Sequence, residues 1–176
     1  MSEHPILFSG PMVQAILAGR KTQTRRVFKP NKAWICSPWK VGDRLWVRET
    51  WSPMGYEGIR PLDIPRDTRI LYRSDATGAA WKPSIHMPRW ASRITLEITD
   101  LRDERLQDIS PMDVLAEGVQ TDHSRCTTPD IHPAEYFDKT TLAVFVDLWD
   151  SIYAASGYGF DENPRVLAVS FMRLTA

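Results

Sequence analysis

Residues 10–28 read GPMVQAILAGRKTQTRRVF, a pattern that predicts a short helix, a turn at Arg20 and Lys21, and then a strand. Pro11 lies in the first turn, where its missing N–H is not needed, and Gly19 follows the apolar segment where helices often end. The pattern predicts a helix over residues 10–19. The next segment, TQTRRVF, carries Thr and Val and is typical of a strand.

Strand and helix patterns continue along the rest of the chain. The clearest strand is VGDRLWVRETW (41–51), which alternates in polarity. A Ser cap, Pro and a final Gly predict a short helix in SPMDVLAEG (110–118). Helical spacing predicts a third helix in TLAVFVDLWDSIY (141–153), with Leu142, Phe145, Val146, Trp149 and Tyr153 on one face. Further strands are expected at PILF (5–8), RILY (69–72), ASRITLEITDLRDERL (91–106) and RVLAVSFMRL (165–174), and loops at 52–68 and 121–133.

The order of these elements is not a regular alternation of strand and helix, which argues against a doubly wound sheet. The expected fold class is α+β: a small, partly open, mixed β-barrel with short helices at its periphery. A chain of 176 residues is long enough for one core, so residues 1–176 are expected to form a single domain.

Composition excludes several classes of protein. Hydrophobic residues make up 43% and charged residues 25% of the chain, as in ordinary globular proteins. No apolar run approaches the roughly 18 residues that a bilayer requires, and the first ten residues lack the pattern of a secretory signal. Two cysteines do not make a disulfide scaffold, so a cytoplasmic location is expected.

Charge is balanced overall but uneven along the chain. Residues 1–96 hold 16 Lys and Arg against 7 acids, and residues 97–176 hold 6 against 15. This asymmetry indicates an anionic ligand for the basic part, or two halves that neutralise each other in the fold. Several of the seven tryptophans neighbour a Lys or Arg, as in proteins that stack nucleic-acid bases, although for any single Trp a place in the core is the better explanation.

The strand at 41–51 places a carboxylate where the core is expected. Leu45, Val47, Glu49 and Trp51 share one face, and the apolar character of that face turns it inward. A buried carboxylate needs a partner, so Glu49 is either a ligand-binding residue or half of a structural ion pair.

The segment WKPSIHMPRWASR (81–93) predicts a binding wall. Two prolines restrict the backbone and give a rigid extended loop. Polar and cationic side chains on a stiff loop are suited to ligand binding, which makes Ser84, His86 and Arg89 candidates. His86 is more easily explained as a hydrogen-bonded structural histidine than as a general base.

Lys21 lies at the turn between the first helix and the following strand. If the chain bends there, Lys21 and Thr24 point into one cleft; a lysine among other cations loses proton affinity, and a nearby hydroxyl can become a nucleophile. A solvated basic strand is the simpler explanation. Glu117 ends the short helix at 110–118, where a carboxylate opposes the helix dipole, and that small penalty indicates another use.

No metal or cofactor is expected. His123, Cys126 and His132, with Cys36 as a distant fourth ligand, match no strong zinc pattern, and no phosphate-binding glycine loop is present.

The combination of ILAGRKTQTRR, VGDRLWVRETW and LAEGV resembles the ASCH domain of the PUA-like superfamily. The block KPSIHMPRWASRITLEITDLRDERLQDIS, with LWDSIY and the final strand, resembles a longer branch encoded by phages and prophages. The resemblance implies a β-barrel of about five to six strands. Relative to a small ASCH enzyme, the chain has a loop insertion around residues 52–90 and an added C-terminal helix and strand.

The resemblance also implies a function. ASCH proteins are associated with RNA and modified nucleosides, and one small bacterial member is an amidohydrolase that deacetylates acetylated cytidine. By that similarity Lys21 is the proton acceptor, Thr24 the nucleophile and Glu117 the proton donor. The residues expected to bind an RNA or nucleoside substrate are Arg20, Arg26, Trp46, Glu49, Ser84, His86 and Arg89.

Other functions stay open. Some ASCH proteins are ribonucleases, and a shared fold does not settle the reaction. A non-catalytic RNA-binding module would use Arg25, Arg26, Trp46 and the loop from Trp81 to Arg89. An accessory protein that binds another protein is a third hypothesis.

Overall fold

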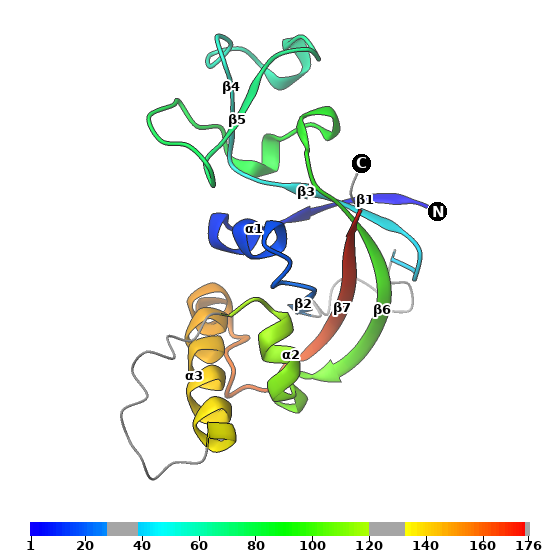
Figure 1. Cartoon of the computed structure of the whole chain (residues 1–176), viewed down its shortest axis with the longest axis vertical. Coiled ribbons are helices and arrows are strands. Elements are labelled where there is room, and N and C mark those ends of the chain that lie inside the picture. Colours follow the sequence, from blue (N-terminus) through cyan, green and yellow to red (C-terminus); the bar gives the residue numbers. More distant parts are fainter. Residues whose placement is uncertain (28–38, 120–132, 175–176) are drawn as a thin grey trace. The chain divides into compact units, whose positions relative to one another are not determined.

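The computed structural model describes residues 1–27, 39–119 and 133–174, with the side chains of 133–140 excepted. Most of its strands and α-helices lie where they were predicted, but β4 extends into the segment 52–68 that was expected to be a loop (Figure 1). The strands are β1 (Glu3–Leu7), β2 (Gln23–Val27), β3 (Arg44–Arg48), β4 (Trp51–Pro53), β5 (Ile70–Tyr72), β6 (Thr95–Arg105) and β7 (Arg165–Leu174). The helices are α1 (Gly10–Leu17), α2 (Pro111–Ala116) and α3 (Pro133–Tyr153).

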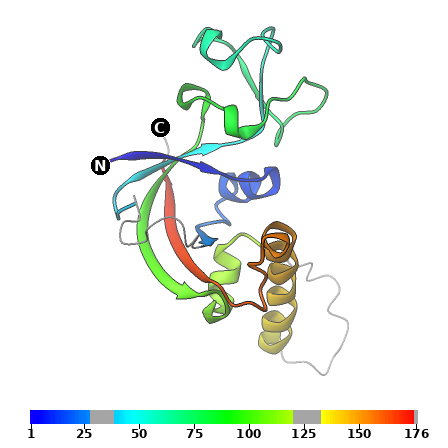
Figure 2. The same cartoon turned by 180° about the vertical axis from the view of Figure 1, so that it is seen from behind.

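Five of the strands form one mixed sheet in the order β1-β3-β6-β7-β2. β1 pairs with β3 in parallel, whereas β3–β6 and β2–β7 are antiparallel. Figure 2 shows β6 and β7, the two longest strands, from behind. β4 and β5 form a separate antiparallel pair.

The barrel prediction needs correction. Within the described residues the strands build an open five-stranded sheet, with β1 and β2 as its edges, and not a closed barrel. Closure requires hydrogen bonds between the two edge strands, and strand patterns alone do not specify which strands pair. The α+β class itself is confirmed by the mixture of strands and helices.

The chain divides into two compact units. Unit 1 comprises residues 1–19, 38–99 and 171–176, and unit 2 comprises residues 20–37 and 100–170. β6 and β7 contribute residues to both units. The single-domain expectation for residues 1–176 stays a prediction.

Unit 2 has its own apolar core between α2, α3 and β7. Leu106, Val114, Phe145, Trp149 and Val166 are buried together in it. Phe145 and Trp149 belong to the helical face that the spacing predicts, so the orientation of α3 is confirmed. The helix begins at Pro133, eight residues before the predicted start.

Unit 1 buries a second cluster beneath β4 and β5. Trp51, Ile64, Met87 and Ala91 form it, with Tyr72 packed against its edge. Trp51 is fully buried, as the alternation of the strand at 41–51 predicts, although the strand is interrupted at Glu49 and Thr50.

Trp46 departs from the predicted alternation. It was expected on the outward face of β3, but only 7% of its surface is exposed. The guanidinium carbons of Arg48 and Arg89 lie 4.6 Å and 6.0 Å from its ring centroid. Cations over an aromatic face are favourable and cover it from solvent, so this indole is not an open platform for stacking a base.

In the ranges that the structure describes, no helix is both long and apolar enough to cross a membrane.

Candidate functional site

Lys21 and Glu117 are paired through their backbones as well as through their side chains. The two residues form an isolated antiparallel β-bridge, and the N–H of Thr22 donates to the carbonyl of Ala116 at 2.8 Å. Helix α2 ends at Glu117, and Gly118 follows at a φ of 80°, a conformation that favours glycine. The end of α2 therefore places the Glu117 carboxylate beside the start of β2.

The Lys21 ammonium is almost completely buried and hydrogen-bonded. Only 3% of the residue is exposed. Its Nζ donates to the carbonyl oxygens of Gln23 and Glu117, both at 2.8 Å, and to Glu117 Oε2 at 2.7 Å. These acceptors match the three N–H donors of an ammonium group, so the charged form is well solvated by the protein.

Burial changes the acid–base properties of Lys21. Loss of water around the amine lowers the pKa of Lys21 below its ordinary value, and the neighbouring Glu117 charge opposes that effect. Arg26 and Arg25 lower the pKa of Lys21 further through like-charge repulsion. A lysine with lowered pKa beside a carboxylate is a pair through which a proton can pass.

Glu117 also contacts Arg25. Its Oε1 accepts a hydrogen bond from Arg25 Nη1 at 3.3 Å, while Oε2 belongs to Lys21. Glu117 is itself 6% exposed. The carboxylate is thus held at both oxygens by cations from one short segment of the chain.

Arg25 is the centre of a larger buried network. It is 3% exposed, its Nε donates to Glu104 Oε1 at 2.9 Å, and its Nη2 lies 3.3 Å from Asp113 Oδ2. Arg102 joins the same two acids, with Nη2 donating to Asp113 Oδ1 at 3.0 Å. Three cations therefore face three carboxylates in unit 2. Close pairing of this kind lets charges stay ionised in a buried setting.

Asp113 illustrates how strongly the network favours ionised acids. Partial burial alone would raise the pKa of Asp113, but hydrogen bonds from Arg102 and Ser110 and the charge of Arg25 lower the pKa to about 2. Asp113 and Ser110 also form a capping box at the start of α2, which fixes the helix that ends in Glu117.

Thr24 lies apart from this carboxylate. Arg25 Nη1 donates to Gln23 Oε1 at 2.7 Å, so these two side chains share one face of β2. Thr24 stands between them in sequence, and strand alternation turns it to the opposite face. The structure brings Lys21 and Glu117 together, while the nucleophilic role of Thr24 stays a prediction.

The other predicted binding residues divide between the units. Arg20 and Arg26 belong to unit 2, where Arg20 is exposed and Arg26 half-buried. Trp46, Glu49, Ser84, His86 and Arg89 belong to unit 1.

The loop from Trp81 to Arg93 is not extended as predicted. Ser84–His86 and Arg89–Ala91 form two short 3-10 helices, because proline at an N-cap favours such turns. Arg89 is paired with the Glu3 carboxylate, with nitrogen–oxygen distances of 2.9 and 3.2 Å. His86 is exposed. The binding roles of these residues stay predictions.

Glu49 is buried and paired. Only 2% of its surface is exposed. Arg93 donates two parallel hydrogen bonds to its carboxylate, from Nε to Oε1 at 2.9 Å and from Nη2 to Oε2 at 3.0 Å. Ser74 Oγ donates to Glu49 Oε2 at 3.0 Å, and Asp75 pairs with the remaining arm of Arg93. Arg93 also lies 3.9 Å above the Tyr72 ring.

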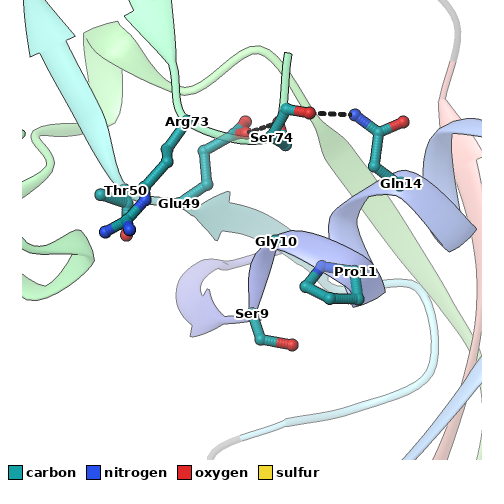
Figure 3. A pocket seen from close by; sticks show the side chains of 8 residues that line it. All are labelled: Ser9, Gly10, Pro11, Gln14, Glu49, Thr50, Arg73 and Ser74. Atoms are coloured by element: carbon teal, nitrogen blue, oxygen red, sulfur yellow. Dashed lines mark hydrogen bonds between the residues drawn. The ribbon is translucent and has the colours of Figure 1, made fainter. Parts of the chain in front are cut away.

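A pocket of about 560 Å³ opens beside Glu49 within unit 1 (Figure 3). The start of α1 forms one side, and the segments around Thr50 and Ser74 form the other. The residues that line it are Ser9, Gly10, Pro11, Gln14, Glu49, Thr50, Arg73 and Ser74.

Sequence patterns did not identify Arg93, Arg73 or the network around Arg25. A signal for Arg93 exists, since a buried Glu49 demands a cation, but the sequence does not say which of 22 Lys and Arg supplies it. His123, Cys126, His132 and Cys36 lie outside the described residues. Within the described residues, no group of three His, Cys, Asp or Glu side chains is arranged to hold a metal ion.

Comparison with known proteins gives similarity in structure only. No family model matches the chain, and no curated protein matches it. Protein EF3133 from Enterococcus faecalis, of family DUF984, superposes on this chain with a TM-score of 0.52 and 11% sequence identity. The superposition covers 99% of this chain and 81% of the Enterococcus protein.

Two further solved structures have lower TM-scores. An ASCH domain from Lactobacillus crispatus has a TM-score of 0.43 at 13% identity, covering 98% of this chain and 79% of its own. Hypothetical protein PH0355 has a TM-score of 0.45 at 10% identity, covering 99% and 100%. The similarity to the Enterococcus protein shows that this chain shares the fold of a DUF984 protein, and it shows the fold alone.

Proposed function

We propose that the chain is an ASCH-type amidohydrolase that removes an acyl group from the exocyclic amine of a cytidine-like base. Lys21 and Glu117 form its proton-transfer pair, and Thr24 is its nucleophile. The observation that supports the proposal is the 2.7 Å contact between the buried Lys21 Nζ and Glu117 Oε2. The ASCH-like motifs around the same residues supply the reaction class.

The contact lets the pair exist in two forms of equal total charge. In one form Lys21 is an ammonium and Glu117 a carboxylate; in the other the proton has moved to give an amine and a carboxylic acid. Burial lowers the pKa of Lys21 and so makes loss of its proton easier than in water. The neutral form holds a base and an acid side by side, which an acyl transfer requires.

Acylation begins when Thr24 Oγ1 attacks the acyl carbon and its proton passes to Lys21 Nζ through a water molecule, since strand alternation turns Thr24 to the opposite face of β2. The carbon–nitrogen bond then breaks, and Glu117 gives its proton to the leaving amine. The products are the free base and an ester on Thr24, with Lys21 as ammonium and Glu117 as carboxylate.

Deacylation reverses the proton movements. Water gives a proton to Glu117 and its oxygen attacks the ester carbon. The ester carbon–oxygen bond breaks, and Lys21 returns a proton to Thr24 Oγ1. The acyl group leaves as a free acid, and the amine and carboxylic acid are restored.

The experiment is a panel of acylated cytidines and their unmodified parents, assayed for turnover by wild type, Thr24→Val and Thr22→Val. Thr22 is exposed and lies one residue after Lys21, so it is a matched control. We expect turnover by wild type and Thr22→Val and a loss of about 10²-fold or more in Thr24→Val.

Three results would change the proposal. No turnover of any acylated cytidine by wild type would overturn the amidohydrolase activity. Salt-sensitive RNA binding without turnover would favour the non-catalytic module, and cleavage of RNA would favour the ribonuclease. Full activity of Thr24→Val would show that Thr24 is not the nucleophile, and a water molecule would then be the attacking group.

A further inference from the structure

The pocket of unit 1 has the size of a small-molecule site. Pockets that enclose small organic ligands hold roughly 300–1,000 Å³, and this one holds about 560 Å³. An inorganic anion alone would leave most of that space to water. The occupant that fits is therefore an organic molecule, and its chemistry follows from the groups that line the cavity.

One wall of the pocket has little hydrogen-bonding capacity left. Glu49 accepts from both Arg93 and Ser74. Gln14 uses its amide nitrogen on the carbonyl of Ser74 at 2.7 Å and on Asp75 Oδ1 at 2.8 Å, as the dashed contact in Figure 3 shows for Ser74. Every group in this wall is fixed by its neighbours, which makes the wall rigid before any ligand binds.

The remaining lining groups have unused donors. Arg73 carries five N–H donors, and within the described residues its guanidinium makes no hydrogen bond or ion pair. The same holds for the hydroxyl of Thr50, and Ser9 leaves its hydroxyl unused at the start of α1. The N–H of Gly10 points out of the first helical turn and has no partner within the helix.

The charges that line the pocket also favour an anionic ligand. The Glu49 carboxylate is matched by the guanidinium of Arg93, and Asp75 does not line the pocket. The charge left for a ligand is that of Arg73, supported by the positive end of the eight-residue helix α1. Unused donors and one unpaired cation are complementary to an acceptor-rich anion.

We infer that this pocket binds a small organic molecule through an oxyanion group, a phosphate ester or a carboxylate. Arg73 binds the oxyanion together with the hydroxyl of Thr50, its neighbour through the hydrogen bond from the Arg73 N–H to the Thr50 carbonyl at 3.0 Å. Ser9 and Gly10 line the α1 side of the same pocket. The organic part fills the space beside Glu49 and Ser74. This site is independent of the activity proposed for Lys21 and Glu117, and either can fail without the other.

The test is calorimetric titration of the full chain at low ionic strength with phenyl phosphate, benzoate, phenol and inorganic phosphate. The variants are Arg73→Met and the matched control Arg69→Met. Arg69 is also exposed, makes no side-chain hydrogen bond or ion pair with the described residues, and does not line the pocket. Both variants remove one surface cation, so both are expected to unfold at the same denaturant concentration as wild type.

We expect saturable binding of phenyl phosphate or benzoate, and which of them binds identifies the oxyanion. Arg73→Met should weaken that binding by about tenfold or more, and Arg69→Met by less than about twofold. Phenyl phosphate should bind more tightly than inorganic phosphate if phosphate is the anion. Phenol binding as tightly as the anions, equal effects of the two variants, or no saturable binding of any probe would each overturn the inference.

Discussion

Arg25 is the residue on which the buried charges of unit 2 depend. Its guanidinium contacts the carboxylates of Glu104, Asp113 and Glu117, and it holds the amide oxygen of Gln23 as well. Glu117 in turn carries the hydrogen bond from Lys21 on which the proposed chemistry depends. Arg25 is therefore best understood as a positioning residue, which acts through Glu117 and not on a substrate.

Arg25→Met should strongly destabilise the protein. Removing the cation leaves three acids without their shared partner, and breaking a buried ion pair at one side costs about 3–5 kcal/mol. The free energy of unfolding in urea measures the change. Arg20→Met is the control: Arg20 is exposed and should lie within about 0.5 kcal/mol of wild type. Equal stability of the two variants would contradict the role assigned to Arg25.

Two acidic residues could be identified as unusual from the sequence alone. Glu49 was expected to be buried with a partner, which the contact with Arg93 confirms. Glu117 was expected to have a use beyond its helix, and its contacts with Lys21 and Arg25 agree with that expectation. The partners themselves could not be predicted, because Arg93 lies 44 residues from Glu49 and Lys21 lies 96 residues from Glu117.

Among the elements, the six-residue helix α2 contributes most to the position of Glu117. A capping box fixes its start, and Glu117 caps its end. The Ser, Pro and Gly signals in SPMDVLAEG were sufficient to predict the helix, because capping depends on local sequence. By contrast, the early start of α3 at Pro133 could not be predicted, since no apolar periodicity marks its first turns.

Asp113 should make the stability of α2 sensitive to acid. Its pKa falls from 3.8 to about 2 on folding, so its stabilising contribution is complete above about pH 4 and is lost as the pH falls through about 2. The free energy of unfolding, measured between about pH 5 and pH 2, should therefore decline more steeply for wild type than for Asp113→Asn.

Ser110→Ala is the control for this measurement. It removes the cap, at a cost of about 1 kcal/mol, and with it one of the hydrogen bonds that lower the pKa of Asp113, but it keeps the Arg102–Asp113 pair. Its acid dependence should therefore lie between that of wild type and that of Asp113→Asn. If the free energies of unfolding of wild type and Asp113→Asn differ by the same amount at every pH in this range, Asp113 does not stabilise the fold through its charge.

At the scale of the whole molecule, charge asymmetry along the chain has a structural explanation. Lys21 and Arg25 come from the basic part of the sequence, and their partners Glu104, Asp113 and Glu117 come from the acidic part. These cations are neutralised inside unit 2, so neutralisation accounts for part of the asymmetry without an anionic ligand. The open sheet could not be predicted for a related reason, because strand order is set by contacts between distant segments.

The proposed activity and a purely structural role make the same prediction for most single substitutions at Lys21 or Glu117, because each leaves a buried charge unpaired. The double variant Lys21→Met/Glu117→Gln separates the two roles. It removes both the ammonium and the carboxylate while keeping similar side-chain volumes, so neither member of the pair is left as a buried charge without the other. It also removes the hydrogen bonds from Nζ to the carbonyls of Gln23 and Glu117 and one contact of Arg25, so some loss of stability is expected.

Turnover of an acylated cytidine by this double variant, with its unfolding in urea measured in parallel, tests the central claim most directly. We predict a protein that is less stable than wild type but still folded in the absence of urea, and whose turnover is lower by about 10²-fold or more. A folded double variant that deacylates the substrate at the wild-type rate would contradict the assignment of Lys21 and Glu117 as the proton-transfer pair.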